Sequence, residues 1–294
     1  MGLGCGGHSR LGKATGGSDE DAIRVVREAL SLGVNFIDTA EAYGTEEIVG
    51  RALKEVPQHE FVLSTKVGVG KSTPAEFRER CLGCLSRLGV EYVDIMHIHG
   101  LSVADYPFAL ESLVPVLSEL RSEGRIRFIG VTEVFAHDPS HEMLRLAGLD
   151  DVWDVVMAGF NILNQSARLS VLPWTRARNV GVLGMFAVRR ALSRPERLQE
   201  VIREMAGAGL VDSAEFDLGD PLGFLVSDGV ASSLTEAAYR FCLGEPGLDA
   251  ILSGTGSVEH VRENARSLCL PPLPPEVSER LRCLFANVDS VSGN

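Results

Sequence analysis

The chain has 294 residues, 45% of them hydrophobic, which suits one large domain or two small ones and excludes a disordered protein. Its 28 basic and 40 acidic residues give a formal net charge of −12, which argues against a nucleic-acid or anionic-membrane partner. No apolar run reaches the roughly 18 to 20 residues that span a bilayer. The first residues also lack the pattern of a secretory signal, so we expect a soluble, cytoplasmic protein.

Short β-branched runs alternate with amphipathic stretches, which is typical of repeated strand–helix units. The expected strands are residues 2–5, 34–38, 60–66, 92–98, 126–132, 152–158, 180–185 and 248–253. The expected helices are residues 19–32, 45–55, 74–88, 107–123, 139–147, 166–177, 232–243 and 257–267. Eight strands with intervening helices predict an α/β fold, a (β/α)8 TIM barrel, in a single domain spanning residues 1–294.

The residues from Ser193 to Ala231 interrupt this rhythm after the seventh strand. They hold a helix-like run near 195–206, followed by turns rich in Gly and Asp. Such an insertion serves as a lid or substrate loop, or is a plain surface excursion, and the sequence leaves both open. Four prolines within 271–275 predict a stiff bend into a C-terminal helix that ends near Phe285.

Four polar side chains lie where the early barrel strands should end: Asp38, Tyr43, Lys66 and His99. The carboxyl ends of barrel strands meet at one mouth, so we expect these groups to converge there. Tyr43 could give or take a proton if Lys66 lowers its pKa from the ordinary value of about 10. Asp38 would hold the ammonium group, and His99 would hydrogen-bond the substrate oxygen.

Two further features have structural explanations beside functional ones. His97 lies two residues before His99, so both should face the barrel interior. The pair could bind a metal ion, but no third ligand has suitable spacing, and we expect His97 to be a buried, hydrogen-bonded core residue. Cys81 and Cys84 have CxxC spacing on a helix without a second pair, which favours buried, reduced cysteines over a zinc or redox site.

The motifs around these residues resemble those of the aldo-keto reductase superfamily over nearly the whole chain. The segments that carry the resemblance are 38–44 (a DTAxxYG pattern), 64–68, 94–99, 127–132 and 160–164. The resemblance implies an NAD(P)-dependent oxidoreductase that interconverts a carbonyl compound, aldehyde or sugar lactol with its alcohol or lactone. Tyr43 would then be the proton donor or acceptor, and a nicotinamide would carry the hydride.

The resemblance also implies where an NADP or NAD cofactor binds. Residues 251–264 are similar to the family's element that receives the phosphates and the adenine, and helix starts favour anions on their own account. Phe186 lies where the family stacks an aromatic ring on nicotinamide. The implied cofactor contacts are Thr132, Asn161, Phe186, Gly254, Thr255, Ser257, Glu263 and Asn264.

Several positions depart from the family pattern. Gly254 and His260 replace the usual cations that hold a 2′-phosphate, which leaves NAD as a serious candidate unless Arg262 compensates. An NAD-using dehydrogenase of a sugar such as galactose or fucose therefore becomes more plausible. Glu133 and Met157 replace the family's carboxamide contacts, so Glu133 would bring a carboxylate to the nicotinamide.

The chain also begins at the first barrel strand, without the hairpin that usually plugs the barrel floor. This arrangement indicates either that the sequence starts too late or that an apolar floor is exposed, and such a floor would favour homo-oligomers.

Two other functions use the same residues. The chain could be a catalytically silent, nicotinamide-binding regulatory subunit of the same fold, although such a protein has no need of the four polar groups. It could also be an isomerase or aldolase in which Lys66 forms a Schiff base, and that chemistry needs no nicotinamide.

Overall fold

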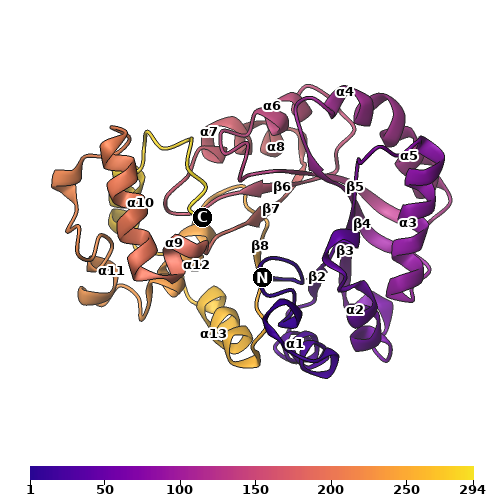
Figure 1. The fold of residues 1–294 in the computed structure, drawn as a ribbon, viewed down its shortest axis with the longest axis horizontal. Coiled ribbons are helices and arrows are strands. Elements are labelled where there is room, and N and C mark those ends of the chain that lie inside the picture. Colours follow the sequence, from indigo (N-terminus) through magenta and orange to yellow (C-terminus); the bar gives the residue numbers. More distant parts are fainter.

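A computed structural model describes residues 1–294 and contains a closed barrel of eight parallel strands, in which each strand pairs with the next and β8 pairs with β1 (Figure 1). The strands are β1 (Gly2–Gly4), β2 (Phe36–Asp38), β3 (Val62–Gly68), β4 (Val93–Leu101), β5 (Ile126–Glu133), β6 (Val155–Gly159), β7 (Gly181–Met185) and β8 (Ala250–Ser253). The predicted (β/α)8 TIM barrel is confirmed, and all eight predicted strands overlap observed ones.

Helices connect the strands and follow the last one, and most of them cover the outside of the barrel. They are α1 (Asp19–Ser31), α2 (Glu46–Leu53), α3 (Pro74–Leu88), α4 (Tyr106–Phe108), α5 (Val114–Ser122), α6 (Glu142–Ala147), α7 (Ala167–Ser170), α8 (Leu172–Arg178), α9 (Arg190–Ser193), α10 (Pro195–Gly207), α11 (Phe224–Ser227), α12 (Leu234–Leu243), α13 (Val258–Cys269) and α14 (Pro275–Leu284). Ser18 and Thr73 each form a capping box, which fixes the starts of α1 and α3. No helix is both long enough and apolar enough to span a membrane.

Two predicted helices are interrupted at proline. The predicted helix 107–123 consists of α4, a π-helical turn at Ala109–Leu113 and α5, with Pro115 in the first turn of α5. The predicted helix 166–177 divides at Val171, with Pro173 in the first turn of α8. Proline has no N–H to donate to the preceding turn, so a continuous helical ladder cannot run through either position.

Three aspartates fasten the strands at the barrel floor, the end opposite the mouth. The carboxylate of Asp94 accepts a hydrogen bond from the backbone N–H of Leu63, and Asp154 and Asp249 do the same for β5 and β7. Each bond joins a strand to the aspartate at the start of the next strand. These carboxylates therefore hold neighbouring strands together at the floor and lie away from the mouth.

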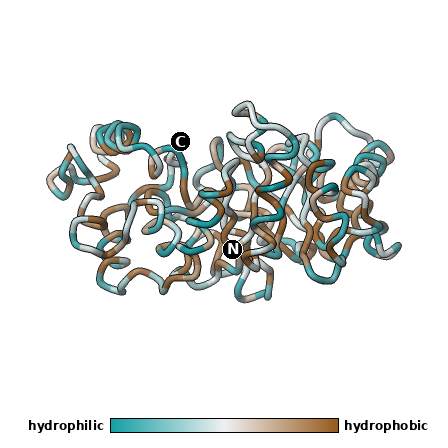
Figure 2. The backbone as a smooth tube through the Cα atoms, turned by 90° about the horizontal axis from the view of Figure 1, so that it is seen from below, coloured by the Kyte–Doolittle hydropathy of each residue, from teal (hydrophilic) through white to brown (hydrophobic).

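Hydrophobic stretches, brown in Figure 2, alternate with hydrophilic ones along the chain, and the buried hydrophobic side chains form one large core. A small second cluster fills the barrel interior, with Ile95, Phe135 and Met157 among its members. At the floor, Phe128 is 43% exposed and Phe36 is half-buried, so part of the expected apolar floor meets solvent.

All six cysteines are free. Cys81 and Cys84 are buried, as expected, whereas Cys269 and Cys283 are exposed. The two exposed cysteines lie near the ends of α13 and α14.

The insertion after β7 forms an ordered lobe beside the barrel, drawn in orange in Figure 1, and contains α9, α10 and α11. Its Phe216 packs against Phe285, with ring centres 5.7 Å apart, and Arg280 of α14 lies over the ring of Phe224. The C-terminus lies beside α9, where the backbone N–H of Ala191 donates to Gly293 O. The lobe thus packs aromatic side chains against the C-terminal helix and the residue that follows it.

Candidate active site

A buried ion pair lies at the mouth between β2 and β3. Lys66 has no exposed surface, and its Nζ donates to Asp38 Oδ2 at 2.6 Å and to Thr39 O at 2.7 Å. Ser64 Oγ donates to the other carboxylate oxygen of Asp38 at 2.8 Å. Burial is the largest influence and alone would lower the pKa of Lys66, but Asp38 and Tyr43 together outweigh it and the net pKa is raised. Lys66 is therefore a fixed positive charge.

Tyr43 and His99 meet beside this pair. Tyr43 lies on a short 3-10 turn (Glu41–Tyr43) after β2, and its Oη is 3.4 Å from His99 Nε2. The Lys66 Nζ lies 5.0 Å from the centre of the Tyr43 ring. The structure therefore brings together all four side chains that the strand ends predicted: Asp38, Tyr43, Lys66 and His99.

The electrostatics of Tyr43 differ from the expectation. Burial raises the pKa of Tyr43 above its ordinary value, and the positive charge of Lys66 offsets this only in part. The prediction of a lowered pKa is thus wrong for the protein without ligands. The tyrosine is a neutral phenol at neutral pH, which is the form that can donate a proton.

His99 is neutral as well. Burial and then the charge of Lys66 lower the pKa of His99 to about 3. A neutral imidazole can donate a hydrogen bond from one ring nitrogen while the other accepts, as a relay from Tyr43 requires.

The lowered pKa of His99 predicts acid sensitivity. The unfolded chain binds a proton at His99 below a pH of about 6.5, whereas the folded protein resists this until pH approaches 3, so stability falls as pH drops through that window. Between pH 7 and 5 the unfolding free energy of the wild type should fall by roughly 2 kcal/mol more than that of His99→Gln. Urea denaturation at both pH values measures this. His59→Gln, at an exposed floor position, should behave like the wild type. An equal fall in unfolding free energy between pH 7 and 5 for the wild type and His99→Gln would contradict the expectation.

His97 faces the interior one layer below His99, level with Lys66 in the register of β3 and β4. It is fully buried and its ring packs against Gly130, where a methyl group would clash. Neither ring nitrogen has a hydrogen-bond partner, so the expectation of a hydrogen-bonded histidine is wrong. No group of three His, Cys, Asp or Glu side chains has a geometry that could hold a metal ion.

A small hydrogen-bond network, which the sequence did not reveal, positions the tyrosine turn. The Thr45 hydroxyl bonds to Thr39 Oγ1 at 2.9 Å and to Cys5 O at 3.2 Å, and it thereby ties the turn to the loop after β1. In that loop Gly6 lies against the face of Tyr43. The Gly-rich start of the chain was the available signal, since glycine often marks close approach of a backbone to another group.

Gly6→Ala should therefore damage the site without touching its polar groups. A methyl group at Gly6 would lie 2.5 Å from the Tyr43 ring, so the ring must shift. A displacement of about 1 Å costs on the order of a hundredfold in rate, and we expect a fall of that size in kcat. Gly207→Ala on α10 is the control, because a methyl group there meets nothing within 4 Å. Unchanged kcat in Gly6→Ala would show that the contact does not hold the ring in place.

The residues implied for the phosphate and adenine end gather at the loop between β8 and α13. Ser257 caps α13, since its Oγ accepts from the N–H of His260, and Thr255 Oγ1 accepts from the N–H of Ser257. Asn264 Nδ2 donates to Ser253 Oγ at 2.8 Å, and Glu263 is exposed on the same helix. Gly254 is exposed at the start of this loop, which packs tightly on the loop after β1 because Gly256 lies against Gly12.

Arg262 is paired with an acidic side chain of another helix. Its Nε pairs with Glu28 of α1 at 2.7 Å, so the guanidinium is held toward the outer helices. His260 is exposed, and its Nδ1 lies 3.4 Å from the Thr255 hydroxyl.

Glu133 turns away from the mouth. Its carboxylate is 2.8 Å from His141 Nδ1 and accepts from the backbone N–H of Gly159. Strand alternation sends Thr132 inward and Glu133 outward, which disfavours the expected contact of this carboxylate with a nicotinamide. The hydroxyl of Thr132 accepts from the N–H of Gly100 at 2.7 Å, next to His99.

Asn161 is fully engaged within the chain. Its Oδ1 accepts from the N–H groups of Leu163 and Asn164, and its Nδ2 donates to Phe186 O and Ser292 O. Any contribution to cofactor binding would therefore be indirect, through the backbone of Phe186.

Phe186 follows β7 with a positive φ of 66°, a strained conformation for a bulky residue. Its ring is stacked on Phe135 with centres 6.1 Å apart, and the guanidinium of Arg189 lies 4.0 Å from its centre. Strain held by surrounding packing is common at binding sites.

The family model described as the aldo/keto reductase family matches residues 2–284. The chain belongs to this family. An aldo-keto reductase from Bacillus halodurans in its holo form superposes with a TM-score of 0.74 at 24% identity, covering 98% of this chain and 92% of that one. An aldo/keto reductase from Klebsiella pneumoniae in complex with NADP and acetate gives 0.71 at 21% identity, with 98% and 91% covered.

Two of the curated relatives are named for an activity. An L-galactose dehydrogenase of Arabidopsis thaliana is 27% identical over 276 residues, which cover 89% of this chain and 82% of the relative. An NADH-specific methylglyoxal reductase of Escherichia coli strain K12 is 29% identical over 272 residues, with 84% and 82% covered.

Proposed function

We propose that this aldo-keto reductase is an NAD(P)-dependent enzyme, built as one domain, that interconverts a carbonyl compound, aldehyde or sugar lactol with its alcohol or lactone. The observation that carries the proposal is the buried Lys66–Asp38 pair next to the Tyr43–His99 contact. A fixed cation, a neutral phenol and a neutral imidazole at one barrel mouth form an acid–base set for an oxygen atom.

A bound nicotinamide would supply or accept the hydride, while the chain handles the proton. Tyr43 Oη donates its proton to the substrate oxygen in reduction and takes it back in oxidation. Lys66 stabilises the tyrosinate that forms, because its charge is fixed by Asp38 and lies close to the ring. His99 Nε2 hydrogen-bonds the same oxygen and orients it.

The residues present fit a dinucleotide. The Ser257 end of α13 offers a helix start for phosphate, with Gly254 and Thr255 in the loop before it, and Glu263 and Asn264 further along the helix are candidate contacts for the adenine. Phe186 and Thr132 would border the nicotinamide. Lys66 is unsuited to Schiff-base chemistry, because an amine that is fully buried and charged is a poor nucleophile.

A sugar dehydrogenase that prefers NAD is the more specific form of the proposal. Gly254 and His260 offer no strong cation for a 2′-phosphate, and Arg262 is paired with Glu28. The names of the two curated relatives, an L-galactose dehydrogenase and an NADH-specific methylglyoxal reductase, agree with this preference.

The test is turnover of a panel of aldoses and small aldehydes with each of NAD, NADP, NADH and NADPH, together with dinucleotide binding followed by protein fluorescence. We expect oxidation of an aldose with NAD. Strict dependence on NADP would contradict the sugar-dehydrogenase form but keep the reductase. Tight binding of a dinucleotide without any turnover would favour the silent regulatory subunit, and no binding at all would exclude both.

A further inference from the structure

Arg189 is a cation without an acidic partner at the barrel mouth. It follows Phe186 by three residues, and its side chain forms no ion pair, although the chain carries 40 acidic residues. One guanidinium nitrogen donates to Ser292 Oγ at 3.5 Å, a long hydrogen bond, and the buried Nε has no partner. The guanidinium also lies over the Phe186 ring, 4.0 Å from the ring centre.

This isolation is unusual for a partly buried arginine. Burial lowers the pKa of Arg189 to about 10, so the group stays charged at neutral pH but is poorly solvated. Arg190 and Arg194 in the same segment are also unpaired, yet both are exposed and water compensates their charge. Arg189 alone combines charge, burial and missing hydrogen bonds, and an oxyanion would relieve all three.

The surroundings restrict where that anion comes from. Arg189 packs its stem on Gly293 of the C-terminal tail, and its head lies over an aromatic ring at the carboxyl end of β7. This is the end of the barrel where Tyr43, Lys66 and His99 converge. The hydrogen-bond partner of Arg189 there is one hydroxyl group, Ser292 Oγ, and the chain end at Asn294 is bound by Arg197 instead.

We propose that Arg189 binds an oxyanion, either phosphate or carboxylate, carried by a molecule held in the barrel mouth. It rests over Phe186 when the site is empty and turns to the anion when the site is filled. This inference deepens the proposed function, because it names the chemical group on cofactor or substrate that this residue recognises. The planar guanidinium suits both uses, since it stacks on a ring and donates two parallel hydrogen bonds to an oxyanion.

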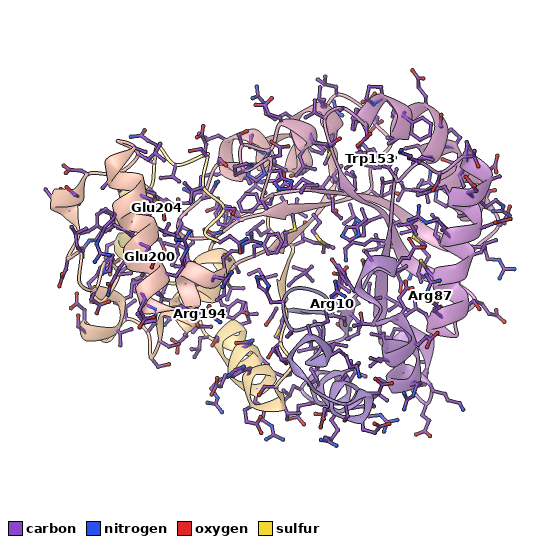
Figure 3. The ribbon with its side chains drawn as sticks, in the orientation of Figure 1. Arg10, Arg87, Trp153, Arg194, Glu200 and Glu204 are labelled. Atoms are coloured by element: carbon purple, nitrogen blue, oxygen red, sulfur yellow. The ribbon has the colours of Figure 1, made fainter.

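The test compares Arg189→Met, which keeps the stem and loses the charge, with Arg194→Met, which removes one exposed charge from the same segment. Figure 3 labels Arg194 at the junction of α9 and α10. Binding of inorganic pyrophosphate and of NADH is measured by calorimetry, and KM is measured for neutral glycolaldehyde and for anionic glyoxylate. Arg189→Lys, which keeps a cation without the planar stack, distinguishes lost charge from lost packing, and thermal unfolding checks that each variant folds.

Arg189→Met should weaken the binding of at least one anion by about tenfold or more. The affinity of Arg189→Lys should lie in between, and that of Arg194→Met should be near the wild-type value. Weaker binding of pyrophosphate and NADH would identify a dinucleotide phosphate as the partner. A raised KM for glyoxylate alone would identify an acidic substrate. Equal behaviour of Arg189→Met and Arg194→Met in every assay would overturn the inference while leaving the proposed oxidoreductase intact.

The protein could also bind pyrophosphate through Arg189 but turn over no substrate with any dinucleotide. That outcome would support the anion site and contradict the proposed enzyme.

Discussion

Tyr43→Phe is expected to lower kcat by about a thousandfold while the affinity for the dinucleotide stays within a factor of about two. The phenol hydroxyl is the group at the mouth that lies within reach of both His99 and the Lys66 charge. Removing it deletes the proton donor but leaves the ring, which packs on Gly6, in place. Steady-state kinetics and fluorescence titration with NADH measure the two quantities separately.

Tyr92→Phe is the matched control, since Tyr92 stands just before β4 at the opposite end of the barrel. It should leave both quantities unchanged. Retention of more than a tenth of wild-type kcat in Tyr43→Phe would show that another group moves the proton, with His99 then the next candidate.

Lys66→Met should both inactivate and destabilise the protein. Asp38 would remain buried with only the Ser64 hydroxyl to balance its charge, and such a loss typically costs about 3–5 kcal/mol. The double variant Lys66→Met with Asp38→Asn removes both charges. It should be clearly more stable than the sum of the single changes predicts, yet it should stay inactive because the cation beside Tyr43 is gone.

Urea denaturation of the wild type, Lys66→Met, Asp38→Asn and the double variant gives the coupling free energy between Lys66 and Asp38. Arg145→Met provides a comparison, because Arg145 and Glu142 form an exposed pair that should be worth less than about 1 kcal/mol. A cost below that level for Lys66→Met would mean that Asp38 becomes protonated or hydrated at little expense, and that the pair is not a fixed charge.

The regular part of the fold could be predicted because its signals are local. Strand and helix periodicity predicted the barrel, and strand ends predicted that Asp38, Lys66 and His99 would converge. The outward direction of Glu133 was predictable too, since adjacent residues of a strand face opposite sides.

Other features depend on contacts between distant segments and have no local signal. The raised pKa of Tyr43 follows from burial by the loop after β1, whereas the sequence revealed only the neighbouring charge. The full engagement of Asn161 depends on the C-terminal tail, 131 residues later in the chain. The contact between Phe186 and Arg189 depends on the positive φ of Phe186, which the residue type at that position does not predict.

The outward turn of Glu133 bears on the stereochemistry of the proposed hydride transfer. A nicotinamide ring has two faces, and hydrogen bonds to its carboxamide decide which one a substrate meets. With Glu133 bound to His141 and with apolar Met157 at the other contact, Thr132 and stacking are left to hold the ring, and stacking does not distinguish one face from its mirror image. Choice of the transferred hydrogen would then rest on Thr132 and on the shape of the mouth.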